Sequence, residues 1–446
     1  MSYTDLAAIV LAAGQGTRMR SDRPKVAHSL AGRPLLGHVL ATLDAVGTDQ
    51  AVVVVGPDMP AVASIAAPRP TVLQAERLGT AHAALQARPV LPEAAGTVLI
   101  LFGDTPLIRP ETLRAMVAAR AEAAVVVLGF AAADPTGYGR LVTAADGTLD
   151  AIVEHKDATA AQRAITLCNS GVMAVDGARL FPLLERVGNA NAKGEYYLTD
   201  IVALARADGL RCAVVTGDEA EMAGINDRAQ LAAAEGVVQG RLRAAAMAGG
   251  VTMTDPATVF LSIDTRLGRD VTVGPFCVFG PGVTVGDGAE IKGFCHFEGC
   301  TVEAGAVVGP YARLRPDAAV GEGAHIGNFV EVKKATVEAG AKVNHLTYIG
   351  DARVGAKANV GAGTITCNYD GFAKHHTDIG AGAFIGSNSA LVAPVSIGDG
   401  AIVGAGSVIT QDVPTDTLAL TRAPQTAREG WAKKFRDHMK RLTGKG

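Results

Sequence analysis

Two groups of polar residues in this 446-residue chain have types and spacings suited to chemistry on phosphorylated molecules. The first follows an apolar run near the start of the chain and consists of Gly14, Gly16, Arg18 and Lys25. Glycines directly after a buried strand let backbone N–H groups approach a phosphate, and the two cations supply charge-assisted contacts. An ordinary glycine-rich turn is the alternative interpretation. The segment is neither a Walker A motif nor the dinucleotide-binding GxGxxG.

The second group lies in the C-terminal half, where Arg315, Lys333, His345 and Tyr348 stand between the aliphatic residues of a repeat. A neutral imidazole accepts a proton near pH 7, and the cations suit a phosphate. An isolated surface histidine is more often only solvated. These residues are about one coil or less apart, taking roughly eighteen residues per coil, so we expect stacking to bring several of them together on one face.

The second group is positioned by a six-residue aliphatic repeat that runs from about Val271 to Ile409. This period fits neither a helix nor a simple strand, but it suits a solenoid with one short strand per repeat. Glycine often follows the aliphatic residue, as at Gly274 and Gly286, and is expected to permit a tight corner. The pattern predicts a parallel β-helix and leaves its hand open, although crossover rules favour a right-handed form. The uninterrupted stretch Cys367–Asp378 lacks a repeat aliphatic and is expected to leave the solenoid as a loop.

The first group is positioned by buried strands that alternate with helical segments from Leu6 to about Gly224. Such alternation predicts an α/β sheet with mostly parallel strands, whose ligands bind at the carboxyl ends of the strands. Asp104 stands at one such end, where a helix cap is the alternative to a binding role. The expected strands are Ala7–Ala12, Ala51–Val55, Thr97–Phe102 and Ala123–Phe130, and the expected helices are Pro34–Val46, Thr80–Ala87 and Pro110–Arg120.

The chain is expected to divide into a first domain at residues 1–226, a helical arm at 227–248 and a repeat domain at 249–446 that ends in a helical tail. The arm is rich in good helix formers and is followed by Gly249-Gly250, a C-terminal stop. A peripheral helix of the first domain is the alternative interpretation of the arm.

Net charge, cysteine spacing and the length of the apolar runs exclude several classes of binding partner. The formal net charge is −3 and the pI is about 6.4, so no basic field indicates binding to nucleic acid or membranes. The six cysteines show no CxxC and no metal-ligand spacing, and we expect free thiols in a reducing compartment. The apolar run Leu6–Ala13 is interpreted as a strand rather than a signal peptide, and no run is long enough to span a membrane. We therefore expect a soluble, cytoplasmic protein.

The segment Leu11–Met19, with Pro24-Lys25 after it, resembles the signature of sugar-nucleotide pyrophosphorylases. With the repeat behind it, the chain from about Ala8 to Trp431 resembles the bacterial family that joins an N-acetylglucosamine-1-phosphate uridylyltransferase to a glucosamine-1-phosphate N-acetyltransferase. The resemblance implies a Rossmann-like nucleotide-diphospho-sugar transferase domain, a left-handed β-helix, and a homotrimer with acetyltransferase sites between subunits. It also implies synthesis of UDP-N-acetylglucosamine, a precursor of peptidoglycan and lipopolysaccharide. One departure is Gln15, where the family often has lysine.

The resemblance also assigns roles in the first domain. Arg18 and Lys25 are expected to be catalytic, and Asp104 and Asn226 to bind Mg²⁺, in the attack of the sugar 1-phosphate on the α-phosphate of UTP. Gln74 is expected to recognise uracil, although without the family a polar helix start with Thr80 as N-cap is favoured. Segments around Gly137 and Glu195–Asp200 also match sugar-binding elements. The expected UTP and UDP-N-acetylglucosamine contacts are Leu11, Ala12, Ala13, Gly14, Lys25, Gln74, Gly79, Thr80, Asp104, Gly139, Glu154, Asn169 and Asn226.

In the repeat domain the resemblance implies that His345 is the general base of acetyl transfer from acetyl-CoA. A solenoid that only assembles the trimer and a non-catalytic regulatory subunit are the alternatives. The basic tail around Trp431 is a solvated helix by default, unless it covers the solenoid end or touches coenzyme A phosphates. The expected glucosamine-phosphate contacts are Arg315, Lys333, Tyr348, Asn359 and Lys374, and the expected acetyl-CoA contacts are Asn368, Tyr369, Ser387, Ala405 and Arg422.

Overall fold

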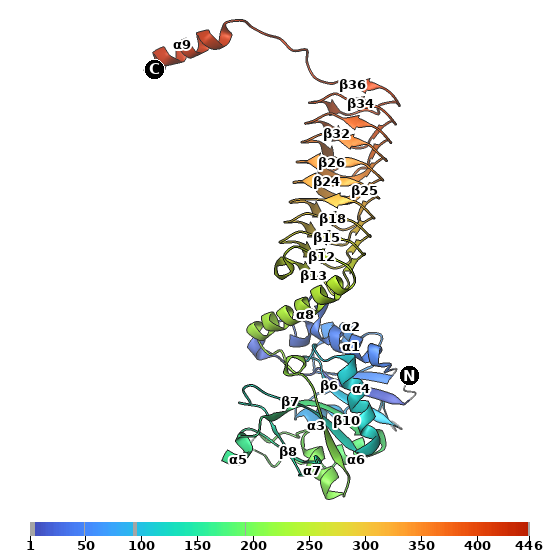
Figure 1. The fold of residues 1–446 in the computed structure, drawn as a ribbon, viewed down its shortest axis with the longest axis vertical. Helices are drawn as coiled ribbons and strands as arrows, with labels where there is room; N and C mark the ends of the chain where they lie inside the picture. The colour runs from blue at the N-terminus through green and yellow to red at the C-terminus, as the bar shows by residue number, and fades with distance from the viewer. Residues whose placement is uncertain (1–4, 49, 92–95, 192, 445–446) are drawn as a thin grey trace. The chain divides into compact units, whose positions relative to one another are not determined.

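The computed structural model describes residues 5–48, 50–91, 96–191 and 193–444. The chain forms two compact units, Met1–Leu242 and Arg243–Gly446 (Figure 1). Within the described ranges, no helix is both long enough and apolar enough to cross a membrane.

A nine-stranded sheet organises the first unit (Figure 1). Its order is β11 (Cys212–Thr216), β7 (Val125–Ala131), β10 (Leu167–Asp176), β6 (Thr97–Phe102), β1 (Leu6–Leu11), β4 (Gln50–Val55) and β5 (Thr71–Leu73). Off this path, β8 (Arg140–Thr143) pairs with β10, and β9 (Leu149–Val153) pairs with β8. Every pairing on the main path is parallel except those of β10, which runs antiparallel to β6 and β7. The prediction of a mostly parallel sheet is therefore confirmed.

Strand β1 is buried on both faces, because its successive side chains enter two different cores. Ile9 and Leu11 join one apolar cluster, whereas Ala8 and Val10 join the other. Continuous burial of this kind is expected of a central parallel strand with helices on both faces. It fixes the position of the carboxyl end of β1. The principal helices are α1 (Leu35–Val46), α2 (Pro60–Ala66), α3 (Thr80–Leu85), α4 (Pro110–Ala119), α5 (Ala160–Arg163), α6 (Gly177–Leu184) and α7 (Asp200–Ala207).

The second unit is a solenoid of stacked coils, as Figure 1 shows. Each predicted repeat aliphatic, from Val273 to Ile409, is buried with no more than 3% of its surface exposed. Successive coils pair in parallel, for example Ile326 with Val343 and Val343 with Val360. The prediction of a parallel β-helix is therefore confirmed.

The short strands of the solenoid form two sheets. The ten-stranded sheet contains β12 (Thr252–Met253), β15 (Thr272–Val273), β18 (Glu290–Ile291), β21 (Val307–Val308), β24 (His325–Asn328), β26 (Lys342–His345), β28 (Asn359–Val360), β31 (Phe384–Ile385), β34 (Ile402–Val403) and β36 (Leu418–Ala419). The fifteen-stranded sheet contains β13 (Phe260–Leu261), β14 (Arg266–Leu267), β16 (Val278–Phe279), β17 (Thr284–Val285), β19 (His296–Phe297), β20 (Thr301–Val302), β22 (Arg313–Leu314), β23 (Ala318–Val320), β25 (Glu331–Val337), β27 (Tyr348–Val354), β29 (Ile365–Cys367), β30 (Thr377–Ile379), β32 (Ala390–Val392), β33 (Val395–Ile397) and β35 (Val408–Ile409).

The glycines that follow repeat aliphatics do not have the predicted role. Gly274 and Gly286 are not among the residues with positive φ. A Cβ atom at Gly274 would lie 2.6 Å from the backbone nitrogen of Gly293, in the next coil. These glycines are therefore required by the close approach of neighbouring coils, and the expectation of a turn geometry at these positions is wrong.

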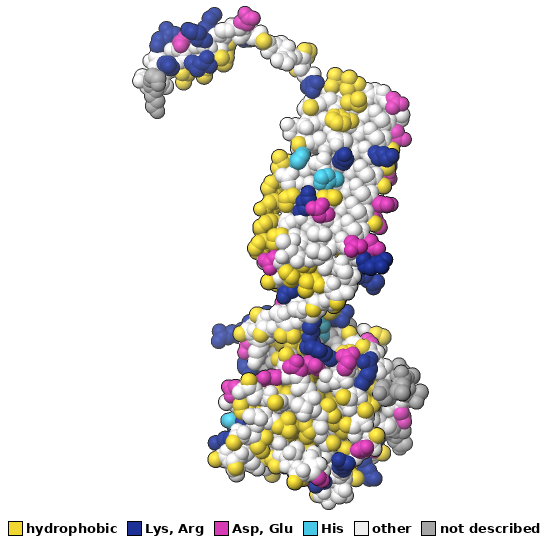
Figure 2. Space-filling view, viewed as in Figure 1, with side chains coloured by type: hydrophobic (Ala, Val, Ile, Leu, Met, Phe, Trp, Pro, Cys, Tyr) yellow, Lys and Arg dark blue, Asp and Glu magenta, His cyan; other side chains and the backbone are white. Residues whose placement is uncertain are grey.

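The left-handed conformation occurs instead at a solenoid corner occupied by aromatic residues. Phe276, Phe294, Tyr311 and Phe329 all have φ between 56° and 62°. Their rings stack with centroids 4.9, 4.9 and 5.1 Å apart, and each is about half exposed. We call these four residues the corner ladder. Apolar side chains gather along one side of the solenoid in Figure 2.

Helices α8 (Arg228–Ala248) and α9 (Trp431–Thr443) lie where helical segments are expected. The first part of α8 packs on the first unit, as the peripheral-helix interpretation requires. There the Ala31 N–H donates to Glu235, and Arg241 donates to the carbonyl of Leu107. Helix α9 has no buried residue.

Candidate functional sites

Two adjoining cavities lie at the carboxyl ends of the strands in the first unit. The smaller, of about 300 Å³, is lined by Leu11, Ala12, Ala13, Gly14, Lys25, Val26, Gln74, Arg77, Gly79, Thr80, Ala83, Phe102, Asp104 and Glu195. The larger, of about 410 Å³, includes Glu154 and Asn169. The two share Thr80, Phe102 and Glu195. The geometry thus brings together most of the residues predicted to contact UTP and its sugar product.

Lys25 lies at the charged centre of the smaller cavity. Its ammonium forms an ion pair with Asp104 and donates to Asn226 Oδ1 at 3.0 Å. Both partners of the ion pair are well shielded from water, with 12% and 18% of their side chains exposed. Low exposure strengthens this interaction relative to one at the surface. Asn226, predicted from a segment far along the chain, therefore belongs to the same centre.

The donor set at this centre fits Mg²⁺. Asp104 and Asn226 direct two oxygen atoms at one point, where they already meet the cation of Lys25. Among the described residues, no group of three or more histidine, cysteine, aspartate or glutamate side chains is placed to hold a metal. Mg²⁺ is commonly held by one or two carboxylate or carbonyl groups, with substrate phosphates and water supplying the other ligands.

Two glycines are required by the shape of the smaller cavity. Gly79 has φ +123°, and a Cβ there would collide with the backbone of Tyr196. Gly16 has φ +64°, and its Cβ would lie 2.5 Å from Cβ of Lys25. Gly16 therefore lets Lys25 pack closely and was missing from the predicted contacts, although its place in the motif was a signal. Thr80 is not the N-cap: Gly79 holds that position.

Arg18 occupies a different environment from Lys25. It lies on the 3₁₀ turn η1 (Thr17–Met19), is exposed, and lines neither cavity. The structure therefore does not group the two predicted catalytic cations.

The larger cavity has the groups needed to bind sugar hydroxyls. Burial raises the pKa of the Glu154 carboxyl. Asn169 Oδ1 accepts from the Gly171 N–H at 2.9 Å, which leaves the amide NH₂ free to donate. The backbone N–H of Asn169 donates to the carbonyl of Gly139 at 2.8 Å, which places the predicted Gly139 beside them. Tyr197 and Thr199 also line the cavity.

In the solenoid, three cations converge on one face. Arg315 donates to Glu331 at 2.8 Å. Lys333 has a lowered pKa, first because of the contact with Lys374 and then because of the charges of Lys374 and Arg315. Lys333 lies on β25 of the solenoid, whereas Lys374 comes from the loop, so the loop must fold back to complete the cluster. Excess positive charge of this kind suits a phosphate. Tyr348 belongs to the same face, because it pairs with Glu331.

His345 lies on the neighbouring face. Its Nδ1 is 2.6 Å from Oδ1 of Asn328. Asn328 lies one coil earlier, where it pairs with His345 in the sheet. Amide oxygens accept, so Nδ1 carries the proton and Nε2 keeps a lone pair. Asn328 was missing from the predicted site. His345 also lines a cavity of about 380 Å³ with Tyr311 and Phe329 of the corner ladder.

One corner, at Leu346, separates His345 from Tyr348 and the cation cluster. Within one chain the structure therefore groups the predicted phosphate contacts but places the predicted base around the corner from them. Asn359 lies on the face of His345, where it pairs with Lys342.

Three predicted acetyl-CoA contacts lie together further along the solenoid. The Gly406 N–H donates to the Ser387 carbonyl at 2.8 Å, so Ser387 stands beside Ala405 in the next coil. Arg422 donates to the carbonyl of Ala405. Asn368 lies in the loop and donates from Nδ2 to Asp351 at 2.6 Å, whereas the Tyr369 hydroxyl donates to the Gly371 carbonyl.

The loop is shorter than predicted. Cys367 ends β29, and Thr377 and Asp378 belong to β30, so the projecting segment is Asn368–His376. The prediction of Cys367–Asp378 was too long because it relied on aliphatic residues, whereas Thr377 is fully buried at a solenoid position without being aliphatic.

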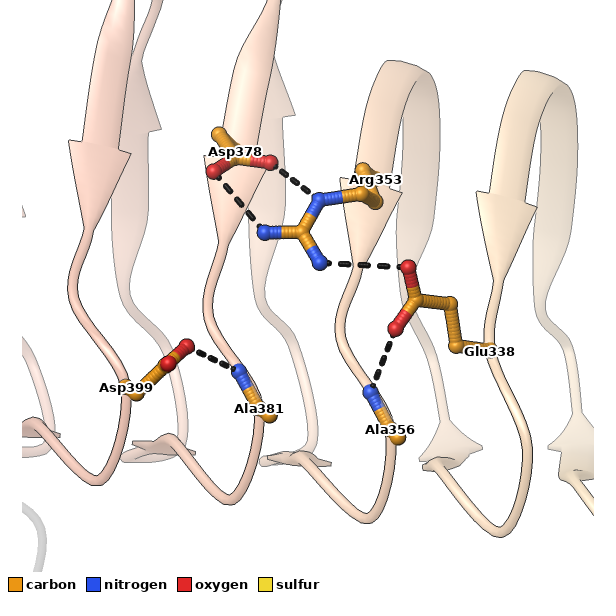
Figure 3. A network of polar contacts seen from close by, with 6 residues as sticks. All are labelled: Glu338, Arg353, Ala356, Asp378, Ala381 and Asp399. Atoms are coloured by element: carbon orange, nitrogen blue, oxygen red, sulfur yellow. Dashed lines mark hydrogen bonds and ion pairs between the residues drawn. The ribbon is translucent and has the colours of Figure 1, made fainter.

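Arg353 holds the returning end of this loop, as Figure 3 shows. It donates to both oxygens of Asp378, at 2.5 and 2.9 Å, and to Glu338 at 3.1 Å. Glu338 in turn accepts from the Ala356 N–H at 2.9 Å. Isolated surface ion pairs contribute little, but a bidentate pair within a network fixes geometry. Asp378 is therefore held in register two residues after the loop.

Replacing Arg353 with methionine is expected to lower the predicted acetyl transfer by about 10- to 100-fold, because small displacements of binding groups have large kinetic effects. Initial rates of coenzyme A release at varied acetyl-CoA would measure the loss. Arg266→Met, which removes an exposed arginine from β14, is the matched control. Equal rates for Arg353→Met and the control would contradict a role for Arg353 in holding the loop in position.

Comparison with known proteins agrees with both halves of this description. A family model described as a MobA-like NTP transferase domain matches residues 8–173. A model described as bacterial transferase hexapeptide (six repeats) matches residues 264–299, 299–334 and 376–411. These matches confirm the predicted fold class, and the repeats are consistent with a left-handed β-helix.

Similar proteins extend over nearly the whole chain. Bifunctional protein GlmU of Rhodospirillum rubrum is 69% identical over 99% of this chain and 100% of its own length. The protein of the same name from Paramagnetospirillum magneticum is 65% identical, and that from Xanthobacter autotrophicus is 60% identical, each over 98% of both chains. The prediction of a bifunctional transferase is confirmed. The chain belongs to the family of bifunctional GlmU proteins.

Proposed function

We propose that this protein makes UDP-N-acetylglucosamine by two transfers in one chain. The repeat domain acetylates glucosamine-1-phosphate with acetyl-CoA, and the first domain transfers UMP from UTP to the resulting N-acetylglucosamine-1-phosphate. We assign residues 1–226 to uridylyl transfer, 227–248 to a helical arm, and 249–446 to acetyl transfer. The product would supply precursors of peptidoglycan and lipopolysaccharide.

Uridylyl transfer requires alignment and charge neutralisation rather than a protein nucleophile. An oxygen of the sugar phosphate attacks the α-phosphorus of UTP, and the bond to pyrophosphate breaks. Lys25 lines the smaller cavity together with Gly14, and its ammonium can neutralise the triphosphate there. Asp104 and Asn226 would hold Mg²⁺, which neutralises phosphate charge when bound. The adjoining cavity with Glu154 and Asn169 receives the sugar.

Acetyl transfer requires a base for the sugar amine. An ammonium cannot attack until it loses a proton, and His345 Nε2 has a free lone pair because Nδ1–H is held by Asn328. The amine nitrogen then attacks the thioester carbonyl, the carbon–sulfur bond breaks, and coenzyme A leaves. Arg315, Lys333 and Lys374 bind the sugar phosphate.

We also propose a homotrimer in which a second copy completes the acetyltransferase site. Four half-exposed stacked rings in the corner ladder form an apolar surface that monomers rarely expose. Phe329 connects this surface to the cavity of His345. Phe329→Glu is therefore expected to reduce the solution mass to that of a monomer and to abolish acetyl transfer, with uridylyl transfer retained. Light scattering would measure the mass, and an unchanged trimer would contradict this interface.

The observation that carries the proposal is the occurrence of two separate cation centres, one around Lys25 and one around Lys333, on two transferase folds. The test supplies glucosamine-1-phosphate, acetyl-CoA, UTP and Mg²⁺ and follows UDP-N-acetylglucosamine. Product is expected only when acetyl-CoA and UTP are both present. Product formed from glucosamine-1-phosphate without acetyl-CoA, or none at all, would contradict the proposal.

A further inference from the structure

A buried glutamine in the nucleotide cavity has its amide nitrogen fully engaged by the protein. Gln74 is 4% exposed and lines the smaller cavity. Its Nε2 donates to the Gly79 carbonyl at 3.0 Å and contacts His82 Nδ1 at 3.1 Å. An amide nitrogen has two hydrogens, so these partners use both.

The Gly79 carbonyl fixes which way the amide faces. If the amide were turned over, its oxygen would meet that carbonyl, and two acceptors would be left together in a buried position. With the nitrogen on this side, Oε1 faces away from Gly79 and His82. Among the described residues, no donor is bonded to Gln74 Oε1. Gln74 therefore presents an acceptor, and no donor, to a ligand in the cavity.

His82 can hold this orientation only as an acceptor at Nδ1. The neutral imidazole then carries its proton on Nε2, which lies 3.3 Å from the amide nitrogen of Gln86; both groups are donors, so this contact is not a hydrogen bond. That amide nitrogen donates instead to the backbone carbonyl of His82 at 3.0 Å. The ring is tilted 35° to Tyr196, with centroids 6.4 Å apart, which limits its rotation.

We infer that His82 is a positioning residue that makes the nucleotide site specific for uracil over cytosine. This deepens the proposed uridylyl transfer and rests on it. Uracil presents a donor at N3–H between two acceptors, and N3–H matches the fixed oxygen of Gln74. Cytosine presents a lone pair at N3, which would oppose that oxygen. A buried site arranged for one hydrogen-bonding pattern discriminates strongly against the mismatched pattern.

The test compares UTP with CTP as substrates, using kcat/KM at fixed N-acetylglucosamine-1-phosphate and Mg²⁺. His82→Phe keeps an aromatic ring but removes the acceptor, so one N–H of Gln74 loses its partner and only the Gly79 carbonyl still holds the amide. The preference for UTP over CTP is expected to fall about tenfold, mainly through KM, as expected for one hydrogen bond. His82→Gln, whose amide oxygen can accept from the same NH₂, is expected to restore most of the preference.

Gln86→Leu is the matched control, because it touches the other ring nitrogen and does not contact Gln74. We expect its nucleotide preference to stay within about twofold of the original. A preference unchanged in His82→Phe, or equal losses with both nucleotides, would overturn the inference. A wild-type chain that forms no UDP-sugar from UTP would instead contradict the proposed function, whatever the variants do.

Discussion

His345→Ala is expected to lower acetyl transfer by about 10²- to 10⁴-fold and to leave uridylyl transfer nearly intact. The imidazole is held through Nδ1 by Asn328 at 2.6 Å, so its Nε2 lone pair has a fixed direction. Alanine removes the proposed base, and the sugar ammonium must then lose its proton to water. Coenzyme A release and pyrophosphate release, measured on the same preparation, separate the two activities.

Asn328→Ala tests how much the orientation of the His345 imidazole contributes to acetyl transfer. It leaves the imidazole in place but frees its orientation and tautomer, so a smaller loss of about tenfold is expected. His296→Ala is the matched control, because His296 is an exposed histidine of the solenoid outside both sites. If His345→Ala acetylated glucosamine-1-phosphate as fast as this control, His345 would not be the base.

Lys25→Ala is expected to lower uridylyl transfer by about 10²- to 10³-fold, with acetyl transfer unchanged. Lys25 is the cation that pairs with Asp104 and reaches Asn226, in a site of low exposure. Its removal takes away positive charge that the triphosphate needs when pyrophosphate leaves. Pyrophosphate release at saturating UTP would measure the loss in kcat.

The Mg²⁺ concentration needed for half-maximal rate is expected to differ between variants of Lys25 and of Asp104. Lys25 binds the same two oxygens as the proposed metal, so Lys25→Ala is expected to leave the Mg²⁺ concentration for half-maximal rate unchanged or lower. Asp104→Asn removes a charged ligand, and the required Mg²⁺ concentration is expected to rise. A higher Mg²⁺ requirement in Lys25→Ala alone would contradict this division of roles.

The solenoid could be predicted from the sequence because one physical cause dominates it. The narrow interior accepts an aliphatic or aromatic side chain at every sixth position, and all of those from Val273 to Ile409 are buried. Strand β1 was equally predictable, since burial on both faces leaves an uninterrupted apolar run.

The contacts that complete the sites could not be predicted from the same patterns. The pairing of Asn328 with His345 depends on the register between coils, which slips along this repeat. The meeting of Lys374 with Lys333 depends on how the loop folds back. The contact between Gln74 and His82 depends on the turn at Gly79, where φ is +123°. Each requires a backbone path that side-chain periodicity does not determine.

The pairing of β27 has a consequence for how this enzyme can change over evolution. Tyr348, at its start, pairs with Ile365 before the loop, and Arg353, near its end, pairs with Asp378 after it. The chain leaves and re-enters the stack between two fixed points, so an insertion or deletion within Asn368–His376 leaves the coils in register. Doubling the length of such a segment costs only about 0.6 kcal/mol in closure entropy. A related enzyme could thus exchange its acyl donor by changing this segment, while the proposed sugar phosphate contacts of Arg315 and Lys333 stay in place.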